Sequence, residues 1–172
     1  FVEALVDTAR TRLGVHSGAF WHGEENGDLV LALPLIQPPA RIKPGTGLAG
    51  RCAHTRAMVH SSCLGKVSDL GDLDRIHPDG APHRGSALSL PLLAHDGSVL
   101  GVLQLLHERD DHFDDETRVL ARILTAQGAL ALQHAQFAMS LRPTSELHSE
   151  VEVAREIQRS TLLEVMPEIP GY

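Results

Sequence analysis

The sequence predicts an α+β fold, an antiparallel sheet sandwiched by helices, with a C-terminal connecting helix. Residues 86–93 and 98–107 are apolar at nearly every position and flank Asp96-Gly97, a dipeptide typical of tight hairpins. Strands that are apolar on both faces need cover on both faces. We therefore expect helices on each side of this sheet, and apolar residues at helical spacing predict helices at 2–13 and 114–140.

Glycine and proline divide the rest of the chain into short elements. A polar, Gly-rich turn at 23–28 separates two apolar stretches and predicts a second hairpin. In chain order we expect strands at 19–22 and 29–33, a helix at 48–55, a strand at 58–63 and a long polar loop at 64–84. Long ordered loops often carry function, so this loop is a candidate for covering a site.

The helix predicted at 114–140 carries two neighbouring apolar stripes. The bulky stripe, which we expect to face the sheet, consists of Val119, Ile123, Ala126, Leu130 and Phe137. The second stripe turns to small residues and consists of Leu120, Leu124, Gly128, Ala131, Ala135 and Ala138. Because small residues let another helix approach closely, we expect self-association along the second stripe.

Pro143 interrupts the helical pattern, and residues 146–163 resume it as a charged helix. Five positions fall roughly on one side of it, at Leu147, Val151, Ala154, Ile157 and Thr161. Such a narrow stripe is typical of a two-helix seam. We expect two parts in a piece of a longer protein: a sensory domain at 1–140 and a linker region at 141–172.

Composition and charge exclude several classes of function. The net charge is −7, from 22 acidic against 15 basic residues, and no basic run could follow a phosphate backbone, so we expect no nucleic acid partner. No apolar run in the covered residues is long enough to span a membrane. With only two cysteines and no secretion signal, we expect free thiols and a cytoplasmic protein.

Three segments of the chain occur in the order and spacing of one known family. They are the turn and short helix at 42–53, the hairpin sequence at 89–92 and 97–105, and Phe113-Asp114-Asp115-Glu116 with its apolar helix. Together they resemble the GAF domain, the sensory module of many phosphodiesterases, cyclases and two-component regulators. The resemblance implies an antiparallel sheet between helices, a ligand pocket beneath a variable loop, and homodimers formed through terminal helices.

The end of the chain resembles a different family. Residues 150–163 and Pro167-Glu168-Ile169-Pro170-Gly171-Tyr172 are similar to the lead-in of SpoIIE-like PPM serine/threonine phosphatases of bacteria. The resemblance implies a phosphatase domain beyond this chain, with two divalent metals (Mn or Mg) held by carboxylates. The substrate of such a parent protein would be a phosphorylated anti-sigma-antagonist protein. We expect no cofactor and no catalytic site in this fragment.

Two motifs contain residues typical of a dinucleotide site and of a metal site, but their sequence context does not favour either function. Gly45-x-Gly47-x-x-Gly50 matches a dinucleotide fingerprint, but Pro44 precedes it where a buried strand is required, so we expect a tight turn whose helix start can attract an anion. Soft metal ligands occur at Cys52, His54, His60 and Cys63. Because the first two point in different directions on a helix, we expect no metal site.

Five residues are candidates for the ligand pocket: Cys52, Cys63, His77, His83 and Gln104. His77 and His83 belong to the long loop and are plausible lid residues. Gln104 is the one amide in an otherwise apolar strand, and burying it without a partner would cost about 1–3 kcal/mol. It either faces a ligand or forms a hydrogen bond within the core.

The sequence therefore leads to a function and two alternatives. The first hypothesis is a sensor module that binds a small molecule or receives an upstream signal, and relays it through helices 114–163 to a protein phosphatase. The second is a ligand-free dimerisation module. The third is an enzyme, because some methionine sulfoxide reductases have this fold.

Overall fold

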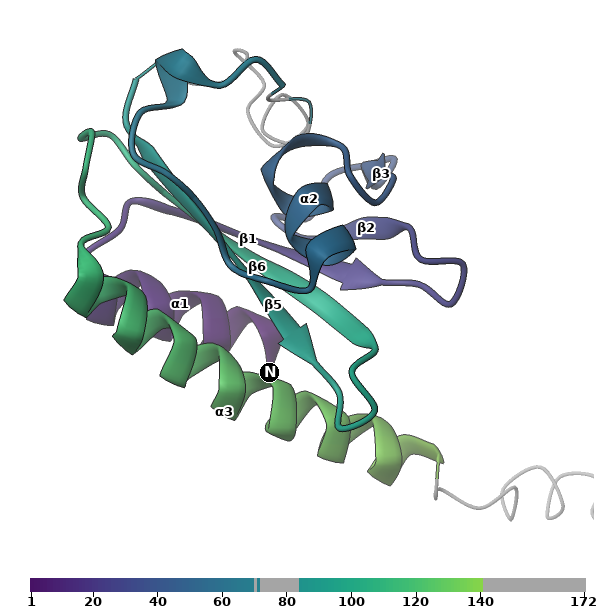
Figure 1. The fold of residues 1–172 in the computed structure, drawn as a ribbon. Coiled ribbons are helices and arrows are strands. Elements are labelled where there is room, and N and C mark those ends of the chain that lie inside the picture. The colour runs from purple at the N-terminus through teal and green to yellow at the C-terminus, as the bar shows by residue number, and fades with distance from the viewer. Residues whose placement is uncertain (70, 72–83, 141–172) are drawn as a thin grey trace, which may run out of the picture. The chain divides into compact units, whose positions relative to one another are not determined.

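The computed structural model describes residues 1–69, 71 and 84–140. Six antiparallel strands form one sheet in the order β3-β2-β1-β6-β5-β4. Helices α1 and α3 lie against one face of the sheet and α2 lies against the other (Figure 1). This arrangement confirms the predicted α+β class with an antiparallel sheet between helices.

The elements follow the predicted order. They are α1 (Val2–Leu13), β1 (Ser17–Gly23), β2 (Leu29–Leu33), β3 (Arg41–Ile42), α2 (Gly47–Thr55), β4 (Val59–Ser61), the 3-10 helix η1 (Leu64–Lys66), β5 (Ser86–Leu93), β6 (Val99–His107) and α3 (Asp115–Ser140). The sequence pattern misses β3 and η1, which are too short to show a periodicity. The helix predicted at 146–163 lies outside the described residues.

Local signals set the boundaries of the main elements. Gly14 ends α1 in the left-handed region at φ 63°, a conformation that glycine adopts without strain. In the central hairpin, the carboxylate of Asp96 accepts a hydrogen bond from the Ser98 backbone N–H at 2.9 Å. At the start of α3, Asp114 Oδ1 accepts from the Thr117 backbone N–H at 2.8 Å, so the predicted N-cap is formed.

The central strands β1, β6 and β5 separate two apolar clusters. Phe20 and Leu103 point toward α1 and α3, and belong to the larger cluster. Their neighbours Trp21 and Val102 point the other way and pack beneath α2. Because consecutive residues of a strand alternate between faces, one apolar strand supplies the core on both sides of the sheet.

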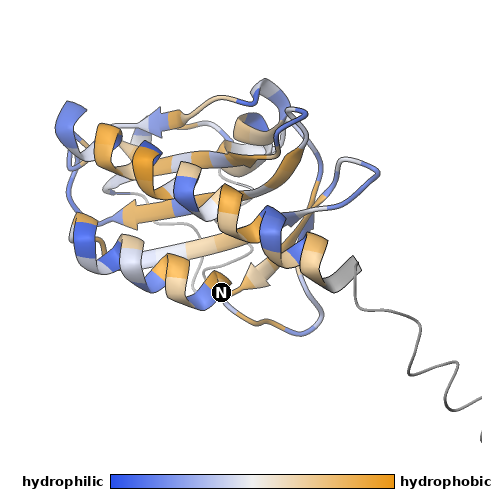
Figure 2. Ribbon diagram, turned by 90° about the horizontal axis from the view of Figure 1, so that it is seen from below, coloured by the Kyte–Doolittle hydropathy of each residue, from blue (hydrophilic) through white to orange (hydrophobic). Residues whose placement is uncertain are grey.

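The prediction that the bulky stripe of α3 faces the sheet is wrong. The side chains of Val119, Ile123, Leu130 and Phe137 are 55%, 50%, 57% and 64% exposed, and Ala126 is exposed as well. Apolar residues therefore mark the outer side of this long helix (Figure 2). The buried side of α3 is formed by Ala121, Thr125, Gly128 and Ala129.

Close packing against α1 explains why small residues face inward. A Cβ atom added at Gly128 would lie 2.9 Å from Leu5 Cδ1 of α1, closer than atoms pack in proteins. The close helix approach expected along the small-residue stripe thus occurs within this chain, at Gly128. A bulky side chain there would push α3 away from α1, so the large apolar residues are left outside.

Candidate functional site

A row of polar side chains crosses the sheet beneath α2. Trp21 of β1, Gln104 of β6 and Ser89 of β5 all lie on this face and are fully buried. The Trp21 indole N–H donates to Gln104 Oε1 at 2.9 Å. In the sheet, Ser89 pairs directly with Gln104. Three adjacent strands therefore bring polar groups close together in an otherwise apolar core.

Ser89 is the chemically unsatisfied member of this row. Its hydroxyl oxygen is buried and has no hydrogen-bond partner among the described residues. Leaving a buried polar group without a partner costs about 1–3 kcal/mol. A small polar ligand or a water molecule that reached this hydroxyl would recover that cost, so the polar row is our candidate binding site.

The cover over the polar row is made of small side chains. Ala49 and Cys52 of α2 are fully buried, and Cys52 packs in the same cluster as Trp21. Burial raises the pKa of the Cys52 thiol to about 12, although a backbone hydrogen bond with Val59 offsets part of this effect. The thiol stays protonated at neutral pH, so it packs as a small apolar group and is a poor nucleophile.

A carboxylate from the following loop holds the start of α2. Asp69 Oδ2 accepts from the Gly47 backbone N–H at 2.7 Å, and its other oxygen accepts from Gly71. These hydrogen bonds lower the pKa of Asp69. The anion expected at this helix start is therefore a side chain of the same chain. Asp69 also fixes the first part of the long loop beside α2.

The glycines of the apparent dinucleotide fingerprint serve a tight turn. Gly45 donates its backbone N–H to the Gly50 carbonyl at 2.7 Å. A Cβ atom at Gly50 would lie only 2.6 Å from the Lys43 carbonyl oxygen. The spacing of these glycines is thus required by close contact between backbone segments, which is the structural role expected for them.

The predicted site residues separate into three groups. Cys52 and Gln104 lie on the α2 face of the sheet. Cys63 is half-buried and precedes η1, where its carbonyl oxygen accepts from Ser61 Oγ at 3.2 Å. His77 and His83 lie outside the described residues. Sequence reasoning missed Ser89, because a serine in a strand gives no signal until the register shows that it faces Gln104.

The described residues contain no group of three His, Cys, Asp or Glu side chains that could hold a metal ion. His60, one of the four possible ligands in the sequence, is engaged elsewhere. Arg118 Nη1 lies 3.0 Å from His60 Nδ1, and because arginine can only donate, this nitrogen accepts. Burial and the Arg118 charge lower the pKa of His60.

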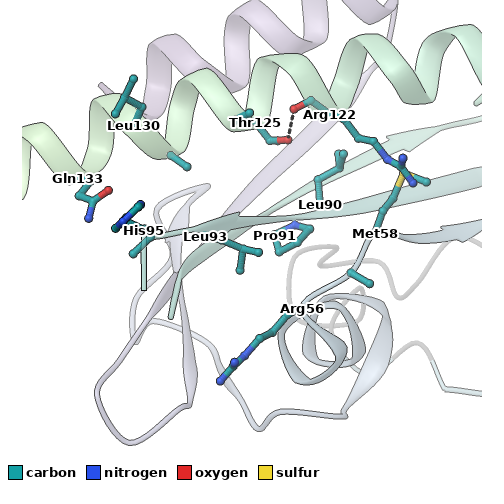
Figure 3. Close-up of a pocket in the computed structure, with 14 residues that line it drawn as sticks. Arg56, Met58, Leu90, Pro91, Leu93, His95, Arg122, Thr125, Leu130 and Gln133 are labelled. Carbon is teal, nitrogen blue, oxygen red and sulfur yellow. Dashed lines mark hydrogen bonds between the residues drawn. The ribbon is translucent and has the colours of Figure 1, made fainter. Parts of the chain in front are cut away.

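An open groove lies on the α3 side of the sheet, between β5, α3 and the turn after α2 (Figure 3). Its volume is about 550 Å³. Leu90 and Leu130 contribute apolar wall, while Arg56, Arg122 and His95 are the basic side chains of the lining, which contains no acidic one. The groove is therefore apolar inside and positively charged around its edges.

Three histidines meet where α1, β1, β6 and α3 come together. The rings of His107 and His112 stack with centroids 3.6 Å apart, and His16 lies 5.0 Å from His107. His112 Nε2 donates to the Leu13 carbonyl at the end of α1, at 3.0 Å. Burial, followed by the neighbouring His112, His16 and Arg109, lowers the pKa of His107, while Glu108 opposes the shift.

Opposite effects on stability are expected from two substitutions in the polar row. Ser89→Ala removes an unpaired buried hydroxyl and should raise the free energy of unfolding by about 1 kcal/mol. Gln104→Met leaves the Trp21 indole N–H without its acceptor and should lower it by about 1–3 kcal/mol. Urea unfolding followed by circular dichroism measures both. Equal losses of stability would show that Ser89 has a partner.

The histidine cluster should make stability fall in mild acid. The pKa of His107 is lower in the folded state than its ordinary value near 6.5, so the unfolded chain binds the proton first as the pH drops. The free energy of unfolding should therefore be lower at pH 5.5 than at pH 7.5. This difference between the two pH values should be smaller in His107→Gln.

In His107→Gln, part of the decrease in the free energy of unfolding at low pH should remain, because the pKa of His60 is lowered too. The exposed residue His54 provides the control, and His54→Gln should keep the full decrease. Urea unfolding at the two pH values is the measurement. If His107→Gln and the parent chain lose the same stability between the two pH values, His107 does not resist protonation in the folded state.

Comparison with known proteins places the fold in a family. The family profile described as GAF domain matches residues 1–133. No curated protein sequence matches the chain. Among the described residues, no helix combines the length and the apolar character that crossing a membrane requires.

Solved structures of GAF domains share the fold. One is the GAF domain of a phosphoenolpyruvate-protein phosphotransferase from Coxiella burnetii, with 19% identity, a TM-score of 0.65, and coverage of 80% of this chain and 83% of that one. Another is the second GAF domain of DevS from Mycobacterium smegmatis, with 22% identity, a TM-score of 0.62, and coverage of 80% and 94%.

An enzyme structure is also similar. The free methionine-R-sulfoxide reductase from Neisseria meningitidis has 27% identity and a TM-score of 0.53, with coverage of 72% of each chain. The two GAF-domain structures, at their lower identities, show the shared fold alone. The family profile, however, spans most of the sequence. The chain belongs to the GAF domain family through its residues 1–133.

Proposed function

We propose that this chain is the regulatory sensor module of a bacterial PPM-type protein serine/threonine phosphatase. GAF domains are sensory and dimerisation modules of signalling proteins. The link to a phosphatase is supported by residues 150–172, which are similar to the lead-in of SpoIIE-like enzymes. In the whole protein, a phosphatase domain with two Mn or Mg ions would act on a phosphorylated anti-sigma-antagonist protein.

The ligand site of the module is the polar row beneath α2. It combines an unpaired hydroxyl at Ser89, the amide of Gln104 and small covering residues such as Ala49. A small polar molecule that accepts from or donates to Ser89 Oγ gains a hydrogen bond in a dry environment, where such a bond is strong. The ligand must displace part of α2 or of the following loop to enter.

The observation that carries the proposal is the apolar outer surface of α3. Val119, Leu120, Ile123 and Leu130 are each about half exposed on a helix that leads from the sheet toward the linker. A contiguous apolar surface of this kind marks a protein interaction site. The groove of Figure 3 adjoins it at Leu130 and widens the apolar area.

A second copy of the chain is the partner we propose for this surface. Apolar residues at positions 119, 123, 126 and 130 alternate spacings of four and three, which suits a seam between two helices. A ligand that prefers one packing of the paired helices shifts the populations of the two arrangements. That shift would pass through the linker to the output domain, and a few kcal/mol is enough to invert the populations.

Charges placed on the α3 surface should break the dimer. We expect the chain of residues 1–172 to be dimeric, and the double variant Ile123→Glu, Leu130→Glu to be monomeric with unchanged circular dichroism. Gln136→Glu, which lies off the seam on the same helix, is the matched control and should remain dimeric. Light scattering after size-exclusion chromatography measures the molecular mass.

A chain shortened at Ser140 separates the contribution of α3 from that of the linker. A dimeric short form places the seam on α3. A monomeric short form beside a dimeric full chain places it in residues 141–172. A monomeric full chain, with or without the substitutions, contradicts the proposed dimer.

A thermal shift separates the sensor from its runner-up, the ligand-free dimerisation module. A ligand that binds only the folded state raises the melting temperature in proportion to the logarithm of its concentration. We expect at least one pool of cell metabolites to raise it, and Ser89→Ala to reduce the increase. If no pool changes the melting temperature of the parent chain, the dimerisation module is the better description.

The third alternative, a reductase, has little support from the thiols. Cys52 is fully buried and its thiol pKa is raised to about 12, so it lacks the thiolate that attacks a sulfoxide. Cys63 is half-buried beside η1. The reductase from Neisseria meningitidis is similar in structure. Because the buried Cys52 thiol is a poor nucleophile, the α2 face of this chain is better suited to binding than to thiol chemistry.

A further inference from the structure

A smaller cavity lies at the end of the sheet, where β1 begins and β6 ends. Its volume is about 180 Å³, and it is lined by residues from β1, β6, η1 and the start of β5. A water molecule in the liquid takes about 30 Å³, so this space suits a molecule of roughly six to nine non-hydrogen atoms. The cavity is too small for a nucleotide or a haem.

The floor of the cavity is apolar and firmly held. Leu64 of η1 and Leu106 of β6 are 1% and 4% exposed. The Leu64 backbone N–H donates to the Gly85 carbonyl at 2.8 Å, and the Gly85 N–H donates to Asp110 Oδ1 at 2.9 Å. These bonds tie η1 and the start of β5 to the loop after β6, so the walls keep their spacing without a ligand.

Gly85 brings a charged neighbour to the cavity. It has φ +101°, and a Cβ atom there would lie 2.1 Å from the His107 carbonyl oxygen. Only glycine allows the chain to approach β6 this closely. The approach places Arg84, the preceding residue, in the cavity lining.

Opposite charges stand in the lining of this cavity. Arg84 and Glu108 both line it and are both exposed. Neither forms an ion pair with another residue of 1–69, 71 or 84–140. A cation and an anion that no described residue neutralises, above an apolar floor, are the groups that recognise a zwitterion with a small apolar side chain.

Two imidazole rings and a hydroxyl group complete the lining. His107 Nδ1 accepts from the Arg109 backbone N–H at 3.0 Å, so the neutral ring carries its hydrogen on Nε2. The ring is only 9% exposed and is clamped by its stack on His112. His16 and Ser17 add a second imidazole and a hydroxyl. His107 is therefore held in position before any ligand arrives.

We propose that this cavity binds a small α-amino acid, with its carboxylate on Arg84, its ammonium group on Glu108 and its side chain on Leu64 and Leu106. The proposal goes beyond the sensor function argued above and does not depend on the polar row beneath α2. His107 and His112 connect the cavity to the first turn of α3, since Phe113 and the N-cap Asp114 follow directly. Occupancy would stabilise that end of the helix.

The test is a binding measurement with defined probes on the chain of residues 1–172. Isothermal titration with glycine, L-alanine and L-valine should show saturable binding of at least one. Isobutylamine, which lacks the carboxylate of valine, and 3-methylbutanoate, which lacks its ammonium group, should bind at least tenfold more weakly. In NMR spectra, the ring C–H signals of His16 and His107 should shift, while the Trp21 indole N–H signal stays in place.

Two variants locate the charges and two control for them. Arg84→Gln and Glu108→Gln should each weaken amino acid binding at least tenfold. Arg12→Gln and Glu25→Gln alter exposed charges elsewhere and should leave it unchanged. Absence of saturable binding by all three amino acids overturns the proposal. So does binding that persists in both cavity variants, or that shifts Trp21 in place of the histidines.

Discussion

Burial of β6 on both faces is the constraint on which the rest of this structure depends. The strand lies between β1 and β5, and its residues from Gly101 to His107 are all buried. Both faces therefore need cover, which α1 and α3 give on one side and α2 on the other. At Gly101 a Cβ atom would come within 2.5 Å of the Trp21 carbonyl oxygen, so even a methyl group is excluded from this part of the sheet.

That constraint also makes polar residues on the sheet informative. In this buried layer the Trp21 indole N–H donates to Gln104, but the Ser89 hydroxyl has no partner within the part of the chain that the structure describes. Unsatisfied polar groups in a core cost stability, so each one calls for an explanation. The polar row beneath α2 and the charged cavity at the end of β6 are two separate places where the fold departs from a purely apolar interior.

Helix α3 has one side in the core, on the face of the sheet opposite to α2, and the other side on the outside of the molecule. Its inner side is narrow because α1 approaches at Gly128, and its outer side keeps large apolar residues such as Ile123 and Leu130 in contact with solvent. The histidine stack joins its first turn to the small cavity. A helix that touches the core on one side and offers an apolar seam on the other is suited to pass a change of packing to a partner.

The sequence by itself determined the fold class and the main elements, because turn dipeptides, caps and apolar periodicity act over a few residues, as at Gly14, Asp96 and Asp114. It also singled out Gln104. Only the tertiary structure decided which side of α3 is buried, since both stripes are apolar and the choice depends on how closely α1 approaches. The same holds for Ser89, Arg84 and Glu108, whose positions depend on strand register and on contacts between segments far apart in the chain.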